Sequence, residues 1–388
     1  MDHDTREMLL DTAGRFFAER CGKDIVNGVE KGVWPADFWK EIEEMGLPLT
    51  AVPEDKGGVG GNLADLMAVL RLAGENAVPV PLAETALAHL LVSAAGGTPV
   101  PGPATVVLGG LAFNNGRVTG RVDRVPFAGV AERFVGVANA GGKPVVVVVA
   151  KGNAKVTAAP SHAGEPYGSV VFDKAACEFS GDSAVSADRA LELAALARAM
   201  QMAGAADKVL ATTVEYSKQR VQFGRSISTF QAIQHMLAEL ASCVAATIAS
   251  AEAASRDADE GGLADGGSFS IAAAKTQASD FAQRIAAISH QSMGAMGFTH
   301  EHILHHYTRR LWVWRRDFGS ESFWGEKIGA AESTWWPARA ETGQEARAGR
   351  RAPVGGPRPV RGPRARATPP GARSCPPGRD PRGPRAGG

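Results

Sequence analysis

The chain has 388 residues, 44% of them hydrophobic and 6% aromatic, and a formal net charge of +1 at pH 7. This length and composition are typical of a globular protein with two or three domains and exclude a fibrous protein. Apolar runs are short and interrupted by charge, and the acidic N-terminal helix does not have the form of a signal peptide. We therefore expect a cytoplasmic protein without a membrane span.

The net charge conceals an uneven distribution. Residues 338–388 contain twelve arginines against Glu341, Glu345 and Asp380, a local charge of +9 that leaves about −8 for the rest. A body with this negative charge does not favour binding to nucleic acid. The four cysteines are far apart and form no CxxC pair, so neither a disulfide framework nor a zinc site is expected.

Residues 1–98 are predicted to form an N-terminal helical domain, because apolar residues recur at helical spacing in three segments. Gly46 is a candidate C-cap for the second of these helices, and Asn62 is a candidate N-cap for the third. The stretch VPEDKGGVGGN between them has the proline and glycines of an irregular loop. The apolar positions are Leu9, Ala13 and Phe16, then Phe38, Ile42 and Met45, then Leu63, Leu66, Met67 and Leu70.

Residues 99–183 change to short β-rich runs, such as RVTGRV and KPVVVVVA, separated by turn residues. This pattern predicts a small antiparallel β domain. Residues 184–336 return to helical periodicity, and four long apolar stripes at alternating spacings of three and four predict a four-helix bundle. The stripes run from Ala199 to Tyr216, from Phe230 to Val244, from Ile271 to Ile288, and from Leu304 to Phe318.

Residues 337–388 consist mainly of Arg, Pro, Gly and Ala and contain no aromatic residue. Such a segment cannot bury a core and is predicted to be disordered. An RNA-binding arm is possible, but the aromatic or lysine residues that favour one are absent. We favour the hypothesis that this segment is an out-of-frame reading of a GC-rich gene, and resequencing of the locus would test it.

One segment carries the strongest functional signal. EYSKQRVQFGRSISTFQAIQHMLAELAS, residues 215–242, joins two predicted bundle helices through a glycine-containing turn rich in Arg, Gln and Phe. Together with the order of the three domains, it resembles the acyl-CoA dehydrogenase family. Two further segments share the resemblance, FWKEIEEMGLPLTAVPEDKGGVGG and SHQSMGAMGFTHEHILHHYTRR. The resemblance covers nearly all of residues 1–330.

The resemblance implies a mainly α fold: an N-terminal helical domain, a central β-barrel-like domain, and a C-terminal four-helix bundle that binds FAD and builds an oligomer. The chain has no GxGxxG after a strand. Arg220 would instead donate to phosphate oxygens and Phe223 would face the adenine. Gln222 and Gln231 would hydrogen-bond the remainder of a flavin that belongs to a neighbouring subunit, and Gln291 and the Gly294 turn would meet its pyrophosphate.

The residues alone leave an alternative for the 215–242 segment, an exposed turn with a buried Phe and ordinary polar caps.

The activity implied by the resemblance is α,β-desaturation of an acyl-CoA thioester. A carboxylate removes the α-proton, and FAD accepts a hydride from the β-carbon. An electron-transfer flavoprotein or a similar acceptor is the expected partner. No motif indicates whether the acyl group comes from a fatty acid or from a steroid side chain.

The sequence departs from the family at the catalytic base. Phe318 stands where the family has a Glu, and Ala194 stands where a second group of members carries the base. Asp317 is the nearest substitute, although a solvated aspartate beside Arg315 and Arg316 is the alternative interpretation. Glu192 would lie on a different helix face, and Glu301 is expected in the first turn of the fourth bundle helix.

The β domain departs from the family as well. The stretches PGPATVVLGG and VPFAGVAERF stand where the family has residues that cover the flavin ring. Four histidines, His300, His302, His305 and His306, surround Glu301, but Leu304 occupies the second histidine position of an HExxH motif. No metal site is expected, and these histidines are interpreted as residues of the helix start and of a dimer surface.

Two functions follow. The first is an FAD-dependent acyl-CoA dehydrogenase with Asp317 or an unrecognised carboxylate as base. The second is a non-catalytic subunit that completes the FAD site of a catalytic homologue. Both require a homo- or hetero-oligomer, a dimer or a tetramer. The reason is that the flavin half-site, formed by Arg220, Gln222, Phe223 and Gln231, would bind the flavin of a neighbouring chain.

Overall fold

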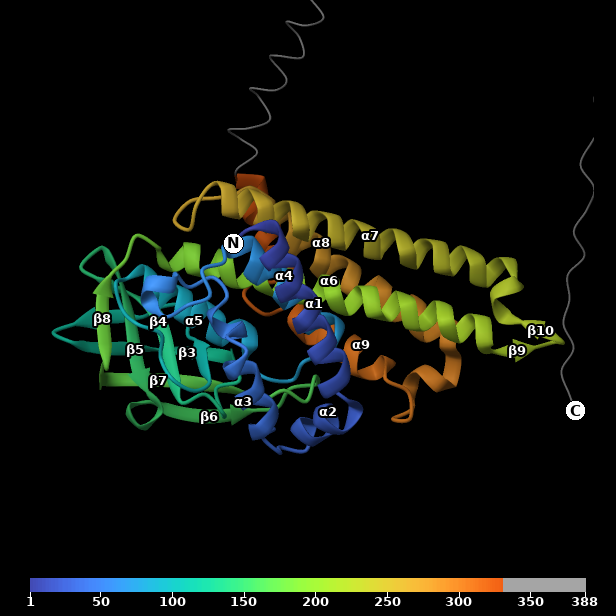
Figure 1. Ribbon diagram of the computed structural model, residues 1–388, viewed down its shortest axis with the longest axis horizontal. Helices are drawn as coiled ribbons and strands as arrows, with labels where there is room; N and C mark the ends of the chain where they lie inside the picture. The colour runs from blue at the N-terminus through green and yellow to red at the C-terminus, as the bar shows by residue number, and fades with distance from the viewer. Residues whose placement is uncertain (331–388) are drawn as a thin grey trace, which may run out of the picture. The chain divides into compact units, whose positions relative to one another are not determined.

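The computed structural model describes residues 1–330. Within this range a β-sheet lies at one end, long helices extend from it, and the N-terminal helices pack against both (Figure 1). The predicted tail of residues 337–388 lies outside the described residues, and its predicted disorder remains a prediction.

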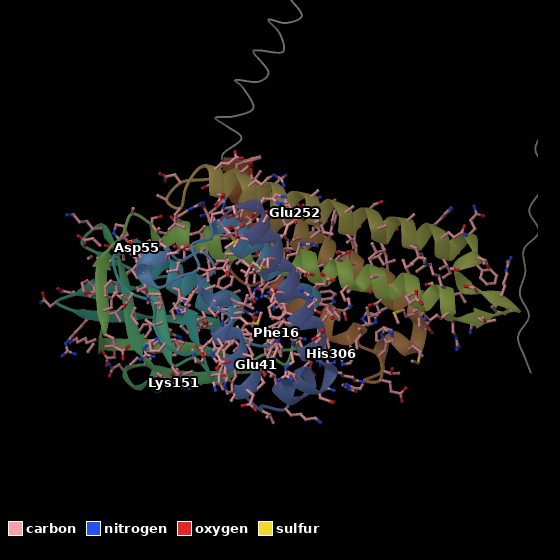
Figure 2. The ribbon with its side chains drawn as sticks, in the orientation of Figure 1. Phe16, Glu41, Asp55, Lys151, Glu252 and His306 are labelled. Carbon is pink, nitrogen blue, oxygen red and sulfur yellow. The ribbon has the colours of Figure 1, made fainter. Side chains whose placement is uncertain are left out.

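Five helices form the N-terminal part: α1 (His3–Arg20), α2 (Lys23–Glu30), α3 (Ala36–Glu44), α4 (Leu63–Glu75) and α5 (Leu82–Ala94). The predicted N-cap Asn62 is confirmed, whereas the C-cap of α3 is Met45, one residue before the predicted Gly46. Asn62 and Asp65 form a capping box at the start of α4, and Gly46 adopts a φ of 70° just after α3. Phe16 of α1, labelled in Figure 2, lies among the N-terminal helices. Its ring stacks on that of Phe38 of α3, with centroids 5.5 Å apart.

Two glycines allow α4 to pack closely on the long helix α6 (Ala187–Gln219). A Cβ at Gly74 would lie 2.1 Å from the Gln201 carbonyl oxygen, and a Cβ at Gly204 would lie 1.9 Å from the Arg71 carbonyl oxygen. Any side chain at either position would therefore push the two helices apart.

Eight strands form one sheet in the order β6-β7-β3-β2-β4-β5-β8, with β1 paired to β4. The strands are β1 (Ala104–Val106), β2 (Ala112–Asn114), β3 (Arg117–Pro126), β4 (Arg133–Ala140), β5 (Lys143–Ala150), β6 (Lys155–Ala159), β7 (Tyr167–Ala176) and β8 (Phe179–Asp182). The prediction of an antiparallel domain is wrong at β4, because β1 and β2 both pair with it in parallel. The chain between these partners is long enough to make the crossover that parallel pairing requires.

The sheet is buried on both faces at its strands β4 and β5. Val146 and Val148 of β5 belong to the core shared with the helices, whereas Val145, Val147 and Val149 face a second core enclosed by strands. Successive strand side chains point to opposite faces, so a continuous valine run fits a strand covered on both sides. Helix α5 packs on this sheet and on α6, which places the β domain against the bundle.

The bundle contains α6, α7 (Gln231–Glu260), α8 (Ser268–Met293) and α9 (Leu304–Trp314), and the short strands β9 (Val221–Gln222) and β10 (Arg225–Ser226) join α6 to α7. The prediction of four long helices is wrong for α9, which has 11 residues and ends four residues before Phe318. Phe318 has a φ of 54°, which a right-handed helix excludes.

Helix α7 is, within residues 1–330, long and apolar enough to cross a membrane by length and composition. Only 22% of its most apolar 18-residue window is buried in the chain. It packs along α6 and α8 in the bundle (Figure 1), and its large hydrophobic side chains are buried or half-buried.

Candidate functional site

The β9–β10 hairpin lies at the end of the bundle farthest from the sheet (Figure 1). Gln222 pairs with Arg225, and the two residues between them, Phe223 and Gly224, have φ values of 52° and 81°. A two-residue hairpin loop with both φ values positive has the twist that its strands require. Glycine adopts this geometry freely, whereas a phenylalanine is strained in it.

A cavity of about 460 Å³ lies beside this hairpin. Five of the six residues predicted to bind the cofactor line it, although they come from segments about seventy positions apart in the sequence. These residues are Arg220, Gln222, Phe223, Gln291 and Gly294. The sixth, Gln231, is not among the lining residues and occupies the first position of α7, directly after the lining residue Phe230.

The electrostatic character of the cavity favours an anion. Among the described residues that line it, Arg220 is the only charged one, and none is a carboxylate. The Arg220 guanidinium forms no ion pair with any residue in the 1–330 range. A planar cationic group with unused donors suits phosphate oxygens.

Phe223 offers a flat apolar surface at the tip of the hairpin. Its side chain is 91% exposed, and its ring meets the Phe230 ring edge to face, with centroids 6.1 Å apart at 85°. The alternative interpretation is therefore wrong in its buried Phe, while its exposed turn with ordinary polar caps stays untested. A phosphate-bearing dinucleotide fits these residues, and the exposed ring leaves room for a second protein surface on the other side of the ligand.

The segment after α9 stands where the family base is expected. Asp317 is 4% exposed, so the interpretation as a solvated aspartate is wrong. Tyr167 on β7 donates a 2.5 Å hydrogen bond to Asp317 Oδ2, and Arg198 Nε on α6 lies 3.3 Å from the same oxygen. Arg124 Nη2 lies 3.5 Å from Oδ1. The turn after Trp314 directs the carboxylate into the protein rather than along the outer face of a continued helix.

Arg198 is the centre of a buried charge network that the sequence did not reveal. Its guanidinium donates to Glu84 Oε1 at 2.6 Å and to Gln201 Oε1 at 2.6 Å, and it lies over the Phe318 ring at 5.4 Å. Burial raises the pKa of the Glu84 carboxyl, although the Arg198 charge opposes this. The available signal was a charged residue inside an otherwise apolar run of α6.

Lys275 holds the turn that carries Asp317. Its fully buried Nζ donates to the carbonyl oxygens of Arg315 and Gly319 at 2.9 and 2.8 Å and to Ser279 Oγ at 3.1 Å. Burial lowers the pKa of this amine to about 7. These bonds satisfy carbonyls that a longer α9 would have used within the helix, so they help to end α9 at Trp314.

One cavity has Asp317 and Phe318 in its lining, and a second is lined by residues near them in the sequence, including Arg316 and Ser320. The smaller has about 230 Å³, below the range of about 300–1,000 Å³ that is usual for ligand pockets. The larger, about 1010 Å³, is lined by Arg124, Arg309, Arg315 and Arg316 around Trp312. The only carboxylate among its described lining residues, Glu321, pairs with Arg315 at 2.6 Å. The larger cavity is therefore positively charged.

The other carboxylates considered from the sequence, Glu192 and Glu301, do not lie beside Asp317 as unpaired groups. Glu192 pairs with Arg189 at 3.0 Å and accepts a hydrogen bond from Ser268, while Ala194 is fully buried. Glu301 was expected in the first turn of the fourth bundle helix, but it lies before α9, which begins at Leu304. The turns that precede α9 delay the start of the helix.

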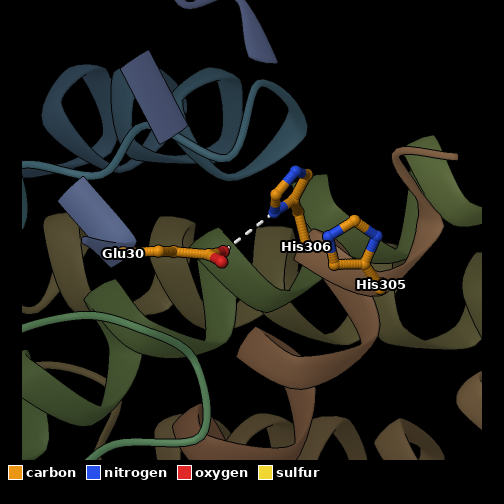
Figure 3. Close-up of side chains that lie close together, drawn as sticks. All are labelled: Glu30, His305 and His306. Atoms are coloured by element: carbon orange, nitrogen blue, oxygen red, sulfur yellow. Dashed lines mark hydrogen bonds and ion pairs between the residues drawn. The ribbon is translucent and has the colours of Figure 1, made fainter. Parts of the chain in front are cut away.

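His305 and His306 are buried, so their interpretation as dimer-surface residues is wrong. His306 Nδ1 lies 2.9 Å from Glu30 Oε1 on α2 (Figure 3). Arg309 forms an ion pair with the same carboxylate. Glu30, His305 and His306 are close enough to share a metal ion, but Arg309 already supplies a positive charge to Glu30. We assign this cluster to joining α2 to α9.

Replacing Glu30 by Gln is expected to remove an acid-sensitive part of the stability. Burial alone would raise the pKa of Glu30, but hydrogen bonds and charge from His306 and Arg309 outweigh it and lower the pKa to about 2. Because the folded pKa is below the usual 4.5, Glu30 stabilises the fold above pH 4.5, and this contribution is lost as the pH falls towards 2. Urea unfolding between pH 6 and pH 3 should show a shallower pH dependence for Glu30→Gln. The exposed control Glu19→Gln should keep the pH dependence of the wild type. If it became as shallow as that of Glu30→Gln, the assignment would be contradicted.

Both helical parts of the chain resemble known proteins. Residues 3–97 match the N-terminal domain model of acyl-CoA dehydrogenases, and residues 184–322 match the C-terminal domain model. The chain is 34% identical over 325 residues to the acyl-CoA dehydrogenase FadE34 of Mycobacterium tuberculosis, covering 79% of this chain and 44% of that protein. It is 30% identical over 312 residues to the acyl-CoA dehydrogenase IpdE2 of the same organism, covering 79% of this chain and 90% of IpdE2. The chain thus spans less than half the length of FadE34.

Solved structures share the fold at lower sequence identity. One is a variant of the Tcur3481-Tcur3483 steroid ACAD, with a TM-score of 0.78, 21% identity, and coverage of 86% of this chain and 99% of that one. Another is the ChsE4-ChsE5 complex from Mycobacterium tuberculosis, with a TM-score of 0.75, 22% identity, and coverage of 86% and 98%. At these identities the likeness concerns the fold alone.

Proposed function

Because this chain belongs to the acyl-CoA dehydrogenase family, we propose that it is a subunit that completes the FAD site of a catalytic homologue and supplies no base of its own. One contrast carries the proposal. The half-site around Arg220 is assembled and has no ion-pair partner within residues 1–330. Phe318 stands where the resemblance predicts the base, and Asp317 beside it is bound to Arg198 and Tyr167.

Members of this family are FAD flavoproteins. In the proposed assembly, Arg220 binds the phosphates, Phe223 stacks on the adenine, and Gln222 and Gln291 donate or accept hydrogen bonds along the dinucleotide. Gly294, with a φ of 59°, brings the backbone at the end of α8 close to the ligand. Gln231 remains a predicted contact from the start of α7. The bound FAD would accept a hydride from the β-carbon of an acyl-CoA whose α-proton is removed by the catalytic subunit.

The partner in this proposal is a homologous chain in a hetero-oligomer. The Phe223 ring supports an oligomer built through the bundle, because an aromatic side chain that is 91% exposed would be covered by a second chain. One of the similar solved structures is titled as a complex of two different chains, and another as a steroid ACAD. The same proposal extends to the whole complex, which would be cytoplasmic. It would desaturate a fatty or steroid side-chain acyl-CoA and pass the electrons to an electron-transfer flavoprotein.

Purification of the chain alone and together with a homologue tests the proposal. We expect a colourless lone chain and a yellow complex whose flavin absorbance is bleached by acyl-CoA in the absence of oxygen. Bleaching by the lone chain would overturn the proposal. Absence of flavin from every complex would also overturn it.

A second function, a self-sufficient dehydrogenase with Asp317 as base, is favoured by one observation. The arginine-lined cavity of about 1010 Å³ includes Arg316, the residue before Asp317, and would suit the phosphates of a nucleotide. The burial of Asp317 counts against it, because its side chain is 1% exposed and does not line the arginine-rich cavity, whereas a base must be within reach of the substrate.

A further inference from the structure

We propose that Arg225 is a positioning residue that holds Phe223 ready to stack on a planar ligand ring; this inference rests on the proposed flavin half-site. Arg225 is exposed and is not among the residues that line the cavity of the half-site. Any effect it has on a ligand there must therefore pass through a neighbouring side chain. The neighbour is Phe230, which does line the cavity.

Arg225 contacts the Phe230 ring, which in turn contacts the Phe223 ring. The Arg225 guanidinium carbon lies 4.2 Å from the centroid of the Phe230 ring, and the Phe230 ring meets Phe223 edge to face. A cation over one face of an aromatic ring is attracted by the ring quadrupole, and edge-to-face aromatic pairs have a preferred geometry. Arg225 has no carboxylate partner within residues 1–330, so the Phe230 ring is its principal side-chain contact.

The Phe223 conformation makes this support necessary. Its φ of 52° is strained for a residue with a Cβ, and its side chain is 91% exposed, so burial does not hold the ring in place. The register between Gln222 and Arg225 fixes the backbone of the hairpin but not the ring of Phe223. The Phe230 ring is the aromatic contact that restricts it, and Arg225 restricts Phe230 in turn.

A fluorine probe tests the first step without any ligand. In the full chain, p-fluorophenylalanine at position 223 should give a single ¹⁹F resonance displaced from its position in urea-unfolded protein. Arg225→Gln is expected to move it towards the unfolded position, and Arg225→Lys to keep part of the displacement. The matched control is Arg284→Gln, which removes another arginine that lies over a phenylalanine, here at 6.0 Å from Phe281 and outside the cavity. An unchanged resonance in Arg225→Gln would overturn the proposal.

The second step is measured in the assembled complex as the Kd of FAD. Arg225→Gln should raise this Kd about two- to fivefold, the effect of one exposed cation–π contact. If Arg225 acts only by positioning, the ratio of mutant to wild-type Kd stays constant between low and high salt. A ratio that collapses at high salt indicates a direct phosphate contact and would overturn the positioning role. If Arg225→Gln moves the ¹⁹F resonance but leaves the Kd of FAD unchanged, the link between Phe223 ordering and the ligand would be overturned. Failure of every complex to hold flavin removes the proposed function, while the ¹⁹F measurement still decides whether Arg225 orders Phe223.

Discussion

Replacing Arg220 by Gln is expected to weaken FAD binding to the assembled complex roughly ten- to hundredfold, because a hydrogen bond to a charged group contributes about 1.5–3 kcal/mol. Of the described residues that line the half-site, Arg220 alone is charged, and no other lining side chain can replace its charge. The measurement is a titration of the apo-complex with FAD, in which flavin fluorescence reports the amount of FAD bound.

Two variants make this result specific. Lys218→Gln removes an exposed positive charge two residues before Arg220 and outside the lining, so it should leave FAD binding unchanged. Arg220→Lys keeps the charge but loses the planar pair of donors and should give an intermediate Kd. Wild-type FAD retention by Arg220→Gln would mean that this guanidinium is not the phosphate ligand, and the half-site assignment would fail.

Replacing Asp317 by Asn is expected to lower the free energy of unfolding by about 3–5 kcal/mol, the usual cost of breaking a buried ion pair from one side. The side chains of Asp317, Arg198 and Glu84 are each 1% exposed, so water cannot solvate the charge left behind. Urea unfolding measures the effect. Asp123→Asn, which removes an exposed carboxylate paired with Arg121, should be nearly neutral.

The same network predicts coupling between substitutions. The combination of Arg198→Met, Glu84→Gln and Asp317→Asn removes the charges together and should cost less than the three single changes added up. Additive losses would show that the three groups do not act as one network.

Asp317→Asn also separates the two candidate functions. In a complex kept below its unfolding temperature, the rate of flavin bleaching by acyl-CoA should stay unchanged if Asp317 is structural. A large loss of this rate in a folded complex would instead favour Asp317 as the base.

Much of the fold was predictable because it depends on local patterns. The capping box at Asn62 and the positive φ at Gly46 follow from residues within one turn of each helix end. The apolar stripes of α6, α7 and α8 predicted the bundle. The length of α9 was not predictable, because the stripe continues to Phe318 while the buried amine of Lys275, forty positions earlier in the chain, binds the carbonyls of the turn.

The candidate site divides in the same way. The RxxFG segment by itself indicated Arg220 and Phe223, since the hairpin that presents them is formed by six consecutive residues. Only the tertiary structure showed that Gln291 and Gly294 line the same cavity and that Gln231 does not.

The state of Asp317 was likewise decided by the tertiary structure. Its partner Tyr167 is separated from it by 150 positions, and Glu84 is separated from Arg198 by 114. Periodicity in a sequence reports which face of a helix is apolar. It cannot report which distant charges meet in the interior, because that depends on how the β domain and the bundle pack together.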